Sequence, residues 1–267
     1  MKVVGGIYSE YCYYPEWHQI FGSGGRGAAA LTRLGVSDVT LHSAVALNHM
    51  GAVQATLSPY GVNVEAIAAK SLIEFSYTHP LSEPAVSPSP LQVHSIPLVE
   101  SDIVLAYGMI ESSIRVKGRH VVYYPQGGDD IRPPKDVAIA ERLALVANEA
   151  EIRTLTRKKD VVEGARDVIN TGQAEVVIVM QGPFGSTVVL ADNTYAVPPF
   201  VTHNVFKIGS GDVFSAAFAK FWVYQGLRAF EAAENASRCA ALYCDTKSID
   251  AIAGFASFKN VGREKRK

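Results

Sequence analysis

The sequence predicts one α/β domain over residues 1–267, built on an open, mostly parallel, doubly wound sheet flanked by helices. Three observations lead to this prediction. Strand-like and helix-like patterns alternate along the chain. The run from Glu175 to Met180 is rich in β-branched residues, as in a buried central strand. Neither an internal repeat nor a Gly/Ser linker divides the chain, and its length suits one large domain.

The N-terminal half is expected to begin with a strand from Lys2 to Ile7. A helix from Arg26 to Leu34 should follow and end at Gly35, because glycine is the usual residue just past a helix. Residues 78–97 contain five prolines, which predict an extended surface connection or edge segment. The remaining expected elements of this half are strands at 39–41, 62–68, 103–107 and 120–124, a helix at 50–58, and a turn at 125–130.

The C-terminal half has the most regular pattern. Asn148 is a good N-cap for a helix that extends to Leu155. Asp192 and Asn193 form the expected turn of a hairpin. The expected strands are 143–147 and 175–180, the hairpin strands are 186–190 and 194–197, and the further helices are 161–170, 209–224 and 230–243.

Composition limits the classes of function. Hydrophobic residues make up 48% of the chain, charged residues make up 19%, and the net charge is −1. This balance is globular and does not indicate nucleic-acid binding; the basic end, residues 262–267, is expected to be a frayed terminus. Three unpaired cysteines (Cys12, Cys239 and Cys244) oppose a disulfide framework. Without a signal-like start or a membrane-length apolar run, the cytoplasm is expected.

The strongest candidate site is Gly209-Ser210-Gly211-Asp212, placed directly before a helical run. Glycines let the backbone turn tightly, and a helix N-terminus offers unpaired amides and a partial positive charge. Phosphoryl transfer needs such donors, and Asp212 could accept a proton from an attacking hydroxyl. An ordinary first-turn acid, favoured by the helix dipole, fits Asp212 equally well.

Two weaker candidates precede it. Glu151 follows Asn148 by three residues, and a carboxylate after a strand's carboxyl end could order Mg²⁺ through water. Two acids in a first helical turn are also electrostatically ordinary. Gly182 and Gly185 follow the apolar strand and could let the backbone approach a nucleotide, although a plain turn explains them as well.

The order and spacing of these pieces resembles the ribokinase-like (PfkB) carbohydrate and nucleoside kinase family. The resemblance covers residues 140–245 best and is fainter over 1–140, where Gly24-Gly25-Arg26-Gly27 looks like the family's N-terminal glycine signature. It implies an ATP- and Mg²⁺-dependent kinase that acts on a small sugar or nucleoside-like hydroxyl. The roles it implies are Asp212 as general base, Gly209, Ser210 and Gly211 as anion hole, Glu151 with Asn148 at Mg²⁺, Gly182, Gly185 and Asn235 at ATP, and Glu10, Gly24, Gly25 and Arg26 at the acceptor.

The pattern also departs from that family. Phe206-Lys207-Ile208 replaces an Asp-Thr-Thr sequence, which puts dependence on a monovalent cation in doubt. Arg26 or Ala29 stands where a sugar-contacting Asn is usual; because arginine only donates hydrogen bonds and carries charge, this favours an unusual, anionic acceptor. Residues 8–21 are short and aromatic, so a reduced or absent β-lid, or a homodimer contact, is expected.

Two other functions fit parts of the sequence. Gly22-x-Gly24-x-x-Gly27 with a later Asp38 satisfies a nominal dinucleotide-binding fingerprint, which would indicate an NAD(P)-dependent oxidoreductase. However, residues 16–21 make a poor buried parallel strand, and Asp38 precedes its strand. The other alternative is a ribokinase-like regulatory protein that binds a nucleotide or sugar with a decayed acceptor site. The departures above favour it, and the intact Gly209–Asp212 turn opposes it.

Overall fold

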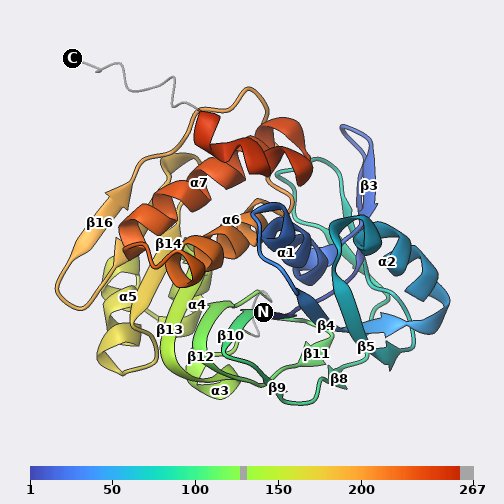
Figure 1. Ribbon diagram of the computed structural model, residues 1–267, viewed down its shortest axis with the longest axis horizontal. Coiled ribbons are helices and arrows are strands. Elements are labelled where there is room, and N and C mark those ends of the chain that lie inside the picture. Colours follow the sequence, from blue (N-terminus) through green and yellow to red (C-terminus); the bar gives the residue numbers. More distant parts are fainter. Residues whose placement is uncertain (127–130, 259–267) are drawn as a thin grey trace.

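The main feature of the fold is a ten-stranded, mostly parallel sheet (Figure 1). The computed structural model describes residues 1–126 and 131–258. The strands of this sheet are β1 (Lys2–Val4), β4 (Thr40–Ala46), β5 (Asn63–Ala69), β9 (Val99–Glu100), β10 (Ile103–Tyr107), β12 (Val116–Tyr124), β13 (Ala138–Asn148), β14 (Val176–Met180), β15 (Ser186–Val189) and β16 (Thr194–Val197). Their order is β16-β15-β14-β13-β12-β10-β1-β4-β5, with β9 paired to β12. In the described part of this sheet only β15 runs antiparallel, to both of its neighbours β14 and β16, so the expected open, mostly parallel sheet is confirmed.

Helices cover the two faces of the sheet because successive strand residues point to opposite sides. On β13, Ala144 and Val146 face one core, while Leu145 and Ala147 face the other. The first core is closed by α1 (Gly22–Arg33), α2 (Met50–Leu57), α6 (Ser210–Ala219) and α7 (Ala229–Thr246). The second is closed by α3 (Pro134–Val137), α4 (Glu149–Thr156) and α5 (Val161–Asn170). Short 3₁₀ turns occupy Leu47–His49, Ser58–Tyr60, Gly182–Phe184 and Asp250–Ser257, and a π turn occupies Lys220–Tyr224.

One crossover of the second face carries no helix. Strands β10 and β12 are parallel neighbours, yet only residues 108–115 connect them. Such connections ordinarily need a dozen or more residues and a helix. Here the short strands β8 (His94–Ser95) and β11 (Ser112–Ser113) lie in extended segments whose apolar side chains Ile96 and Ile114 close the core. Extended chain therefore covers this part of the core in place of a helix.

A separate four-stranded sheet stands beside the main one, in the order β3-β2-β6-β7. Its strands are β2 (Ser9–Cys12), β3 (Trp17–Ile20), β6 (Glu74–Tyr77) and β7 (Ala85–Ser87). The aromatic segment 8–21 thus forms only half of a sheet, and residues 74–87 form the rest. Since β2 pairs in parallel with β6, more than sixty residues later, this pairing depends on contacts that local patterns do not report.

Several element boundaries differ from the prediction. Strand β1 ends at Val4 and not at Ile7, whereas β12 and β13 are longer than expected. Helix α1 begins at Gly22, so the glycine cluster forms its first turns. Residues 127–130 of the predicted turn and the basic tip at 262–267 lie outside the described residues. Cys12, Cys239 and Cys244 are free thiols, and none of the described helices has the length and apolarity needed to cross a membrane.

Candidate active site

Asp212 lies in the first turn of α6, at the edge where the parallel strands end. Two contacts fix this position. The hydroxyl of Tyr107, the last residue of β10, donates to the main-chain oxygen of Asp212 over 2.9 Å. Gln126, two residues past β12, donates through Nε2 to Asp212 Oδ1 over 2.7 Å. Ligands of open α/β sheets bind at this carboxyl edge.

The other oxygen of Asp212 is bound by Arg26. Arg26 Nη1 donates to Asp212 Oδ2 over 2.8 Å, and Arg26 Nη2 donates to Glu10 Oε2. Glu10 comes from β2 of the small sheet, Arg26 from α1 and Asp212 from α6. The side chains are 3%, 0% and 5% exposed, so this is a buried ion cluster that joins the small sheet to helices α1 and α6. We call Glu10, Arg26 and Asp212 the buried triad.

Burial raises the pKa of Asp212 and of Glu10, and the positive charge of Arg26 opposes the rise in both. One guanidinium faces two carboxylates, so the triad carries a net charge of −1 when both are ionised. The rings of Phe21 and Tyr243 lie about 6 Å from the guanidinium carbon (5.9 and 6.0 Å). These rings shield the triad from water, which makes each charge in it costly unless it is paired.

The glycine turn is shaped around Arg26. Gly209 has a φ of +77°, which favours glycine, and a Cβ there would lie 2.3 Å from Arg26 Nε. The Ser210 amide donates to the Lys207 carbonyl over 3.0 Å. Among the described residues, no backbone carbonyl accepts from the amides of Gly211 and Asp212, as is usual in the first turn of a helix. They are therefore the donors that this helix N-terminus offers to an anion.

Asn148 and Glu151 cap α4 at the carboxyl end of β13. Asn148 Oδ1 accepts from the Glu151 amide over 2.9 Å, and the Asn148 amide donates to Glu151 Oε2 over 2.7 Å. Burial raises the pKa of Glu151 to about 8, and the nearby negative charge of Asp212 adds to the rise. Their structural role is thus a capping box. Because Mg²⁺ keeps much of its water and binds one or two carboxylates plus substrate phosphates, Glu151 near Asp212 also fits a water-mediated magnesium site.

The comparisons with known proteins agree with this geometry. The model of the pfkB family of carbohydrate kinases matches residues 118–252, half of the chain. The protein belongs to the pfkB family of carbohydrate kinases. It is therefore a phosphotransferase with an alcohol group as acceptor. No curated protein matches its sequence significantly.

Solved structures show that it has the ribokinase fold. Ribokinase from Thermotoga maritima is 18% identical, with a TM-score of 0.76 over 96% of this chain and 98% of the other. A pyrophosphate-dependent kinase of the ribokinase family, complexed with a pyrophosphate analog and myo-inositol, is 15% identical, with a TM-score of 0.69 over 91% and 95%. Fructokinase from Vibrio cholerae, in a fructose-, ADP- and calcium-bound form, is 15% identical, with a TM-score of 0.71 over 96% and 98%. Family membership excludes the alternative of an NAD(P)-dependent oxidoreductase. The structure agrees, because the strand before the glycine cluster, Trp17–Ile20, belongs to the small sheet and is not a parallel strand of the main one.

The glycines before and within α1 bring this helix close to β1 in the pfkB-family fold. A Cβ on Gly24 would lie 2.6 Å from the Gly5 carbonyl group, and the Gly24 amide donates to the Gly6 carbonyl over 3.0 Å. Gly25 is less constrained, since a Cβ there would meet only ordinary contacts with Leu57 and Phe21 at 3.6 Å. Gly24 is therefore required by close packing, and both glycines are buried.

Gly182, Gly185 and Asn235, which the resemblance assigns to the ATP site, come from the β14–β15 loop and from α7. Gly182 is exposed and open, whereas a Cβ on Gly185 would lie 2.1 Å from the Val197 carbonyl oxygen. Asn235 is half-buried on α7. Gln181 Nε2 donates to Glu149 Oε1 over 2.9 Å, which ties the Gly182 loop to the first turn of α4.

The departures from the family pattern have structural consequences. Phe206, which replaces the leading acid, is 1% exposed and packs edge-on against Trp17 with ring centroids 5.1 Å apart. An apolar ring at this place offers no ligand for a cation. Lys207 is exposed, as expected, and its charge lowers the pKa of Glu151.

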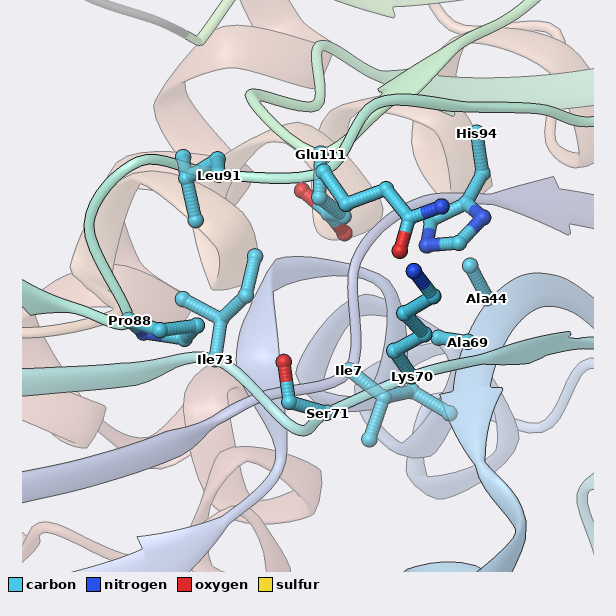
Figure 2. A pocket seen from close by; sticks show the side chains of 11 residues that line it. Ile7, Ala44, Ala69, Lys70, Ser71, Ile73, Pro88, Leu91, His94 and Glu111 are labelled. Carbon is cyan, nitrogen blue, oxygen red and sulfur yellow. The ribbon is translucent and has the colours of Figure 1, made fainter.

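A small cavity of about 20 Å³ lies apart from Asp212 and is lined by Ile7, Lys70, His94 and Glu111 among others (Figure 2). Glu111 is 6% exposed, and its Oε1 has no hydrogen-bond partner among the described residues. Burial raises its pKa to about 7. The cavity has room for about one water molecule. The chain at Gly6 packs against Glu111 and Tyr8, because a Cβ there would touch both side chains.

The partners that hold Asp212 were not predicted from the sequence. Gln126 and Tyr107 come from the ends of neighbouring parallel strands, 86 and 105 residues before Asp212. Residues that directly follow such strands meet at one edge, so the end of β12 was a signal that could have indicated Gln126. The pairing of Arg26 with Glu10 and Asp212 had no local signal.

Proposed function

We propose that the protein is an ATP-dependent kinase that transfers the γ-phosphoryl group to a hydroxyl of a small sugar or nucleoside-like substrate. One observation carries the proposal: a buried carboxylate, Asp212, stands at the carboxyl edge of the sheet, beside amides at the N-terminus of α6 that have no partner among the described residues. A base and a set of amide donors at one point are what in-line phosphoryl transfer to an alcohol requires.

Asp212 serves as the general base in this proposal. Each of its oxygens accepts one hydrogen bond, from Arg26 or from Gln126. A carboxylate oxygen can accept a second, so the acceptor hydroxyl has a place to bind without displacing either donor. Arg26 favours the ionised carboxylate, which is the form that removes a proton.

The transferring phosphoryl group would lie against the amides of Gly211 and Asp212. Glu151 would hold Mg²⁺ through water, with its carboxylate kept in place by the Asn148 cap. When bound, the ion neutralises negative charge that builds on the phosphate oxygens. The chain's own part is to orient these donors and to exclude water around Asp212.

Two features favour a nucleotide over pyrophosphate as donor. Loops at the carboxyl edge expose large apolar side chains: Phe184 is 80% exposed, Val201 58% and Val205 68%. Such side chains suit the faces of a nucleobase, which pyrophosphate lacks. The second feature is the small number of basic residues: among the described residues, Lys207 is the one whose positive charge acts on Glu151. A donor consisting of phosphate alone would call for several basic residues, since nothing else would bind it.

The small sheet supplies the acceptor side. Its strand β2 brings Glu10 to the triad, so we assign this sheet the role of a lid over the acceptor. Tyr13 and Tyr14, between β2 and β3, are 53% and 74% exposed. Aromatic side chains exposed at a sheet edge suit contact with a second copy of the chain, as a homodimer would provide.

The test is a coupled assay with ATP, GTP and pyrophosphate as donors and a panel of sugars and nucleosides as acceptors. With the best pair, Asp212→Asn should lower kcat by about 10²-fold or more while the KM for ATP changes little. Asp192→Asn, in the exposed hairpin turn, is the matched control and should retain activity. Normal turnover by Asp212→Asn would remove Asp212 from its role as base.

A further inference from the structure

The charge on Arg26 is already used by two carboxylates. Its Nη1 and Nη2 atoms bind Asp212 and Glu10, and its Nε, without a partner among the described residues, packs against Gly209. The residue is 0% exposed and lies between two aromatic rings. A ligand could reach this guanidinium only after one of the carboxylates had moved away. Arg26 is therefore not available to an anionic group on the acceptor.

Among the described residues, the positive charge that acts on Glu10 and Asp212 is that of Arg26. Arg26 is the one basic side chain, among the described residues, that is paired with Glu10 or Asp212. The other titratable side chains on which Asp212 acts are Tyr8, Tyr77, Tyr107, Tyr124, Tyr243 and Glu151. Tyrosines with raised pKa values stay neutral, and a second acid makes the site more negative.

From this charge balance we infer that the acceptor is an uncharged sugar, that phosphorylated and carboxylated sugars are excluded, and that Arg26 is a positioning residue which holds Asp212. This rests on the proposed function and narrows its acceptor. A phosphate brings a charge of about −1.5 to −2. It would enter a buried site of net charge −1 in which the described residues leave no cation free, and like charges brought together there are strongly unfavourable. Sugar hydroxyls, in contrast, can donate to the carboxylate oxygens at no cost in charge.

This inference reverses the expectation drawn from Arg26 in the sequence. An arginine in place of the sugar-contacting Asn suggested an anionic acceptor, because its own partners were unknown. Glu10 provides the missing partner. In the triad, the charge of Arg26 cancels that of one carboxylate, and the charge of the second carboxylate remains. The acceptor that fits therefore donates hydrogen bonds and carries no anionic group.

The test compares matched acceptors with the full chain and Mg-ATP: ribose against ribose 5-phosphate, and fructose against fructose 6-phosphate. The uncharged member should have a kcat/KM at least about 100-fold higher. The same pairs are compared by their effect on Tm, which needs no turnover. A phosphorylated sugar that is the better substrate, or that raises Tm more than its uncharged partner, would overturn the inference.

Variants separate the role of Arg26 from a purely structural one. Glu10→Gln removes the spare negative charge but keeps the Arg26–Asp212 pair, so discrimination against the phosphorylated acceptor should fall about tenfold. Arg26→Gln should lower kcat more than it raises the KM of the uncharged sugar, with partial recovery in Arg26→Lys. If Arg26→Gln instead raised KM for phosphorylated acceptors alone, Arg26 would contact the substrate directly. Absence of phosphorylation with every acceptor and donor would refute the proposed function, while the Tm comparison would still decide the charge preference.

Discussion

Removing the charge of Arg26 should destabilise the fold strongly and in a pH-dependent way. In Arg26→Gln, two carboxylates with side chains 3% and 5% exposed lose their common cation. Breaking one buried ion pair by removal of a partner costs about 3–5 kcal/mol. Two pairs share Arg26, but the carboxylates can relieve part of the cost by taking up protons. We therefore expect a loss of about 3–5 kcal/mol in the free energy of unfolding at pH 8.

The pH dependence follows from the direction of the pKa shifts. Burial already raises the pKa of Glu10 and Asp212 above the unfolded values, and loss of Arg26 removes the interaction that opposes the rise. A carboxyl group with a raised folded pKa stabilises the fold below its unfolded pKa, and this contribution is lost as the pH rises through the folded pKa. The deficit of Arg26→Gln should accordingly shrink between pH 8 and pH 5.

Urea unfolding of wild type and variant at both pH values measures this deficit. The triple variant Glu10→Gln/Arg26→Gln/Asp212→Asn, in which the triad carries no charge, is the control and should recover most of the stability. A deficit below about 1 kcal/mol at pH 8, or one that is equal at both pH values, would refute the view that Arg26 balances two buried carboxylates.

Three further predictions concern single sites. Gly209→Ala should lower the free energy of unfolding in urea by about 2–4 kcal/mol, because it combines a φ of +77° with a Cβ 2.3 Å from Arg26 Nε. The control Gly172→Ala, with a φ of +70° and open space around the Cβ, should lower it by only about 1 kcal/mol, and equal losses would contradict the packing argument. Glu111→Gln should become more stable relative to wild type, by up to about 3 kcal/mol, as the pH rises from 5 to 8. The folded pKa of Glu111 is raised to about 7, so wild type bears the cost of a buried ionised carboxylate only at the higher pH. A difference in stability that did not change with pH would be inconsistent with this. Glu151→Gln should lose little stability, because glutamine can still complete the capping box. It removes the carboxylate, so the Mg²⁺ concentration needed for half-maximal activity should rise about tenfold, and an unchanged magnesium titration would exclude Glu151 from the metal site.

The sequence predicted the parts of this protein that depend on near neighbours in the chain. The β-branched run at β14, the hairpin of β15 and β16, and the caps at Asn148 and Gly35 follow from local propensity and side-chain chemistry. The turn at Gly209 and the first-turn acid Asp212 were likewise found where α6 begins. These features need only a few adjacent residues to be stabilised, which is why a pattern reveals them.

The tertiary structure alone decided what those residues face. Glu10, Arg26 and Asp212 come from three elements, and Arg26 and Asp212 are 186 residues apart in the chain. The pairing of β2 with β6 and the helix-free crossover between β10 and β12 depend in the same way on distant segments. The free energy of a buried charge is set by its partners and by the water that packing excludes, and neither is a local property of the chain. For that reason the sequence located the carboxylate and the arginine, but only the fold showed that they neutralise each other.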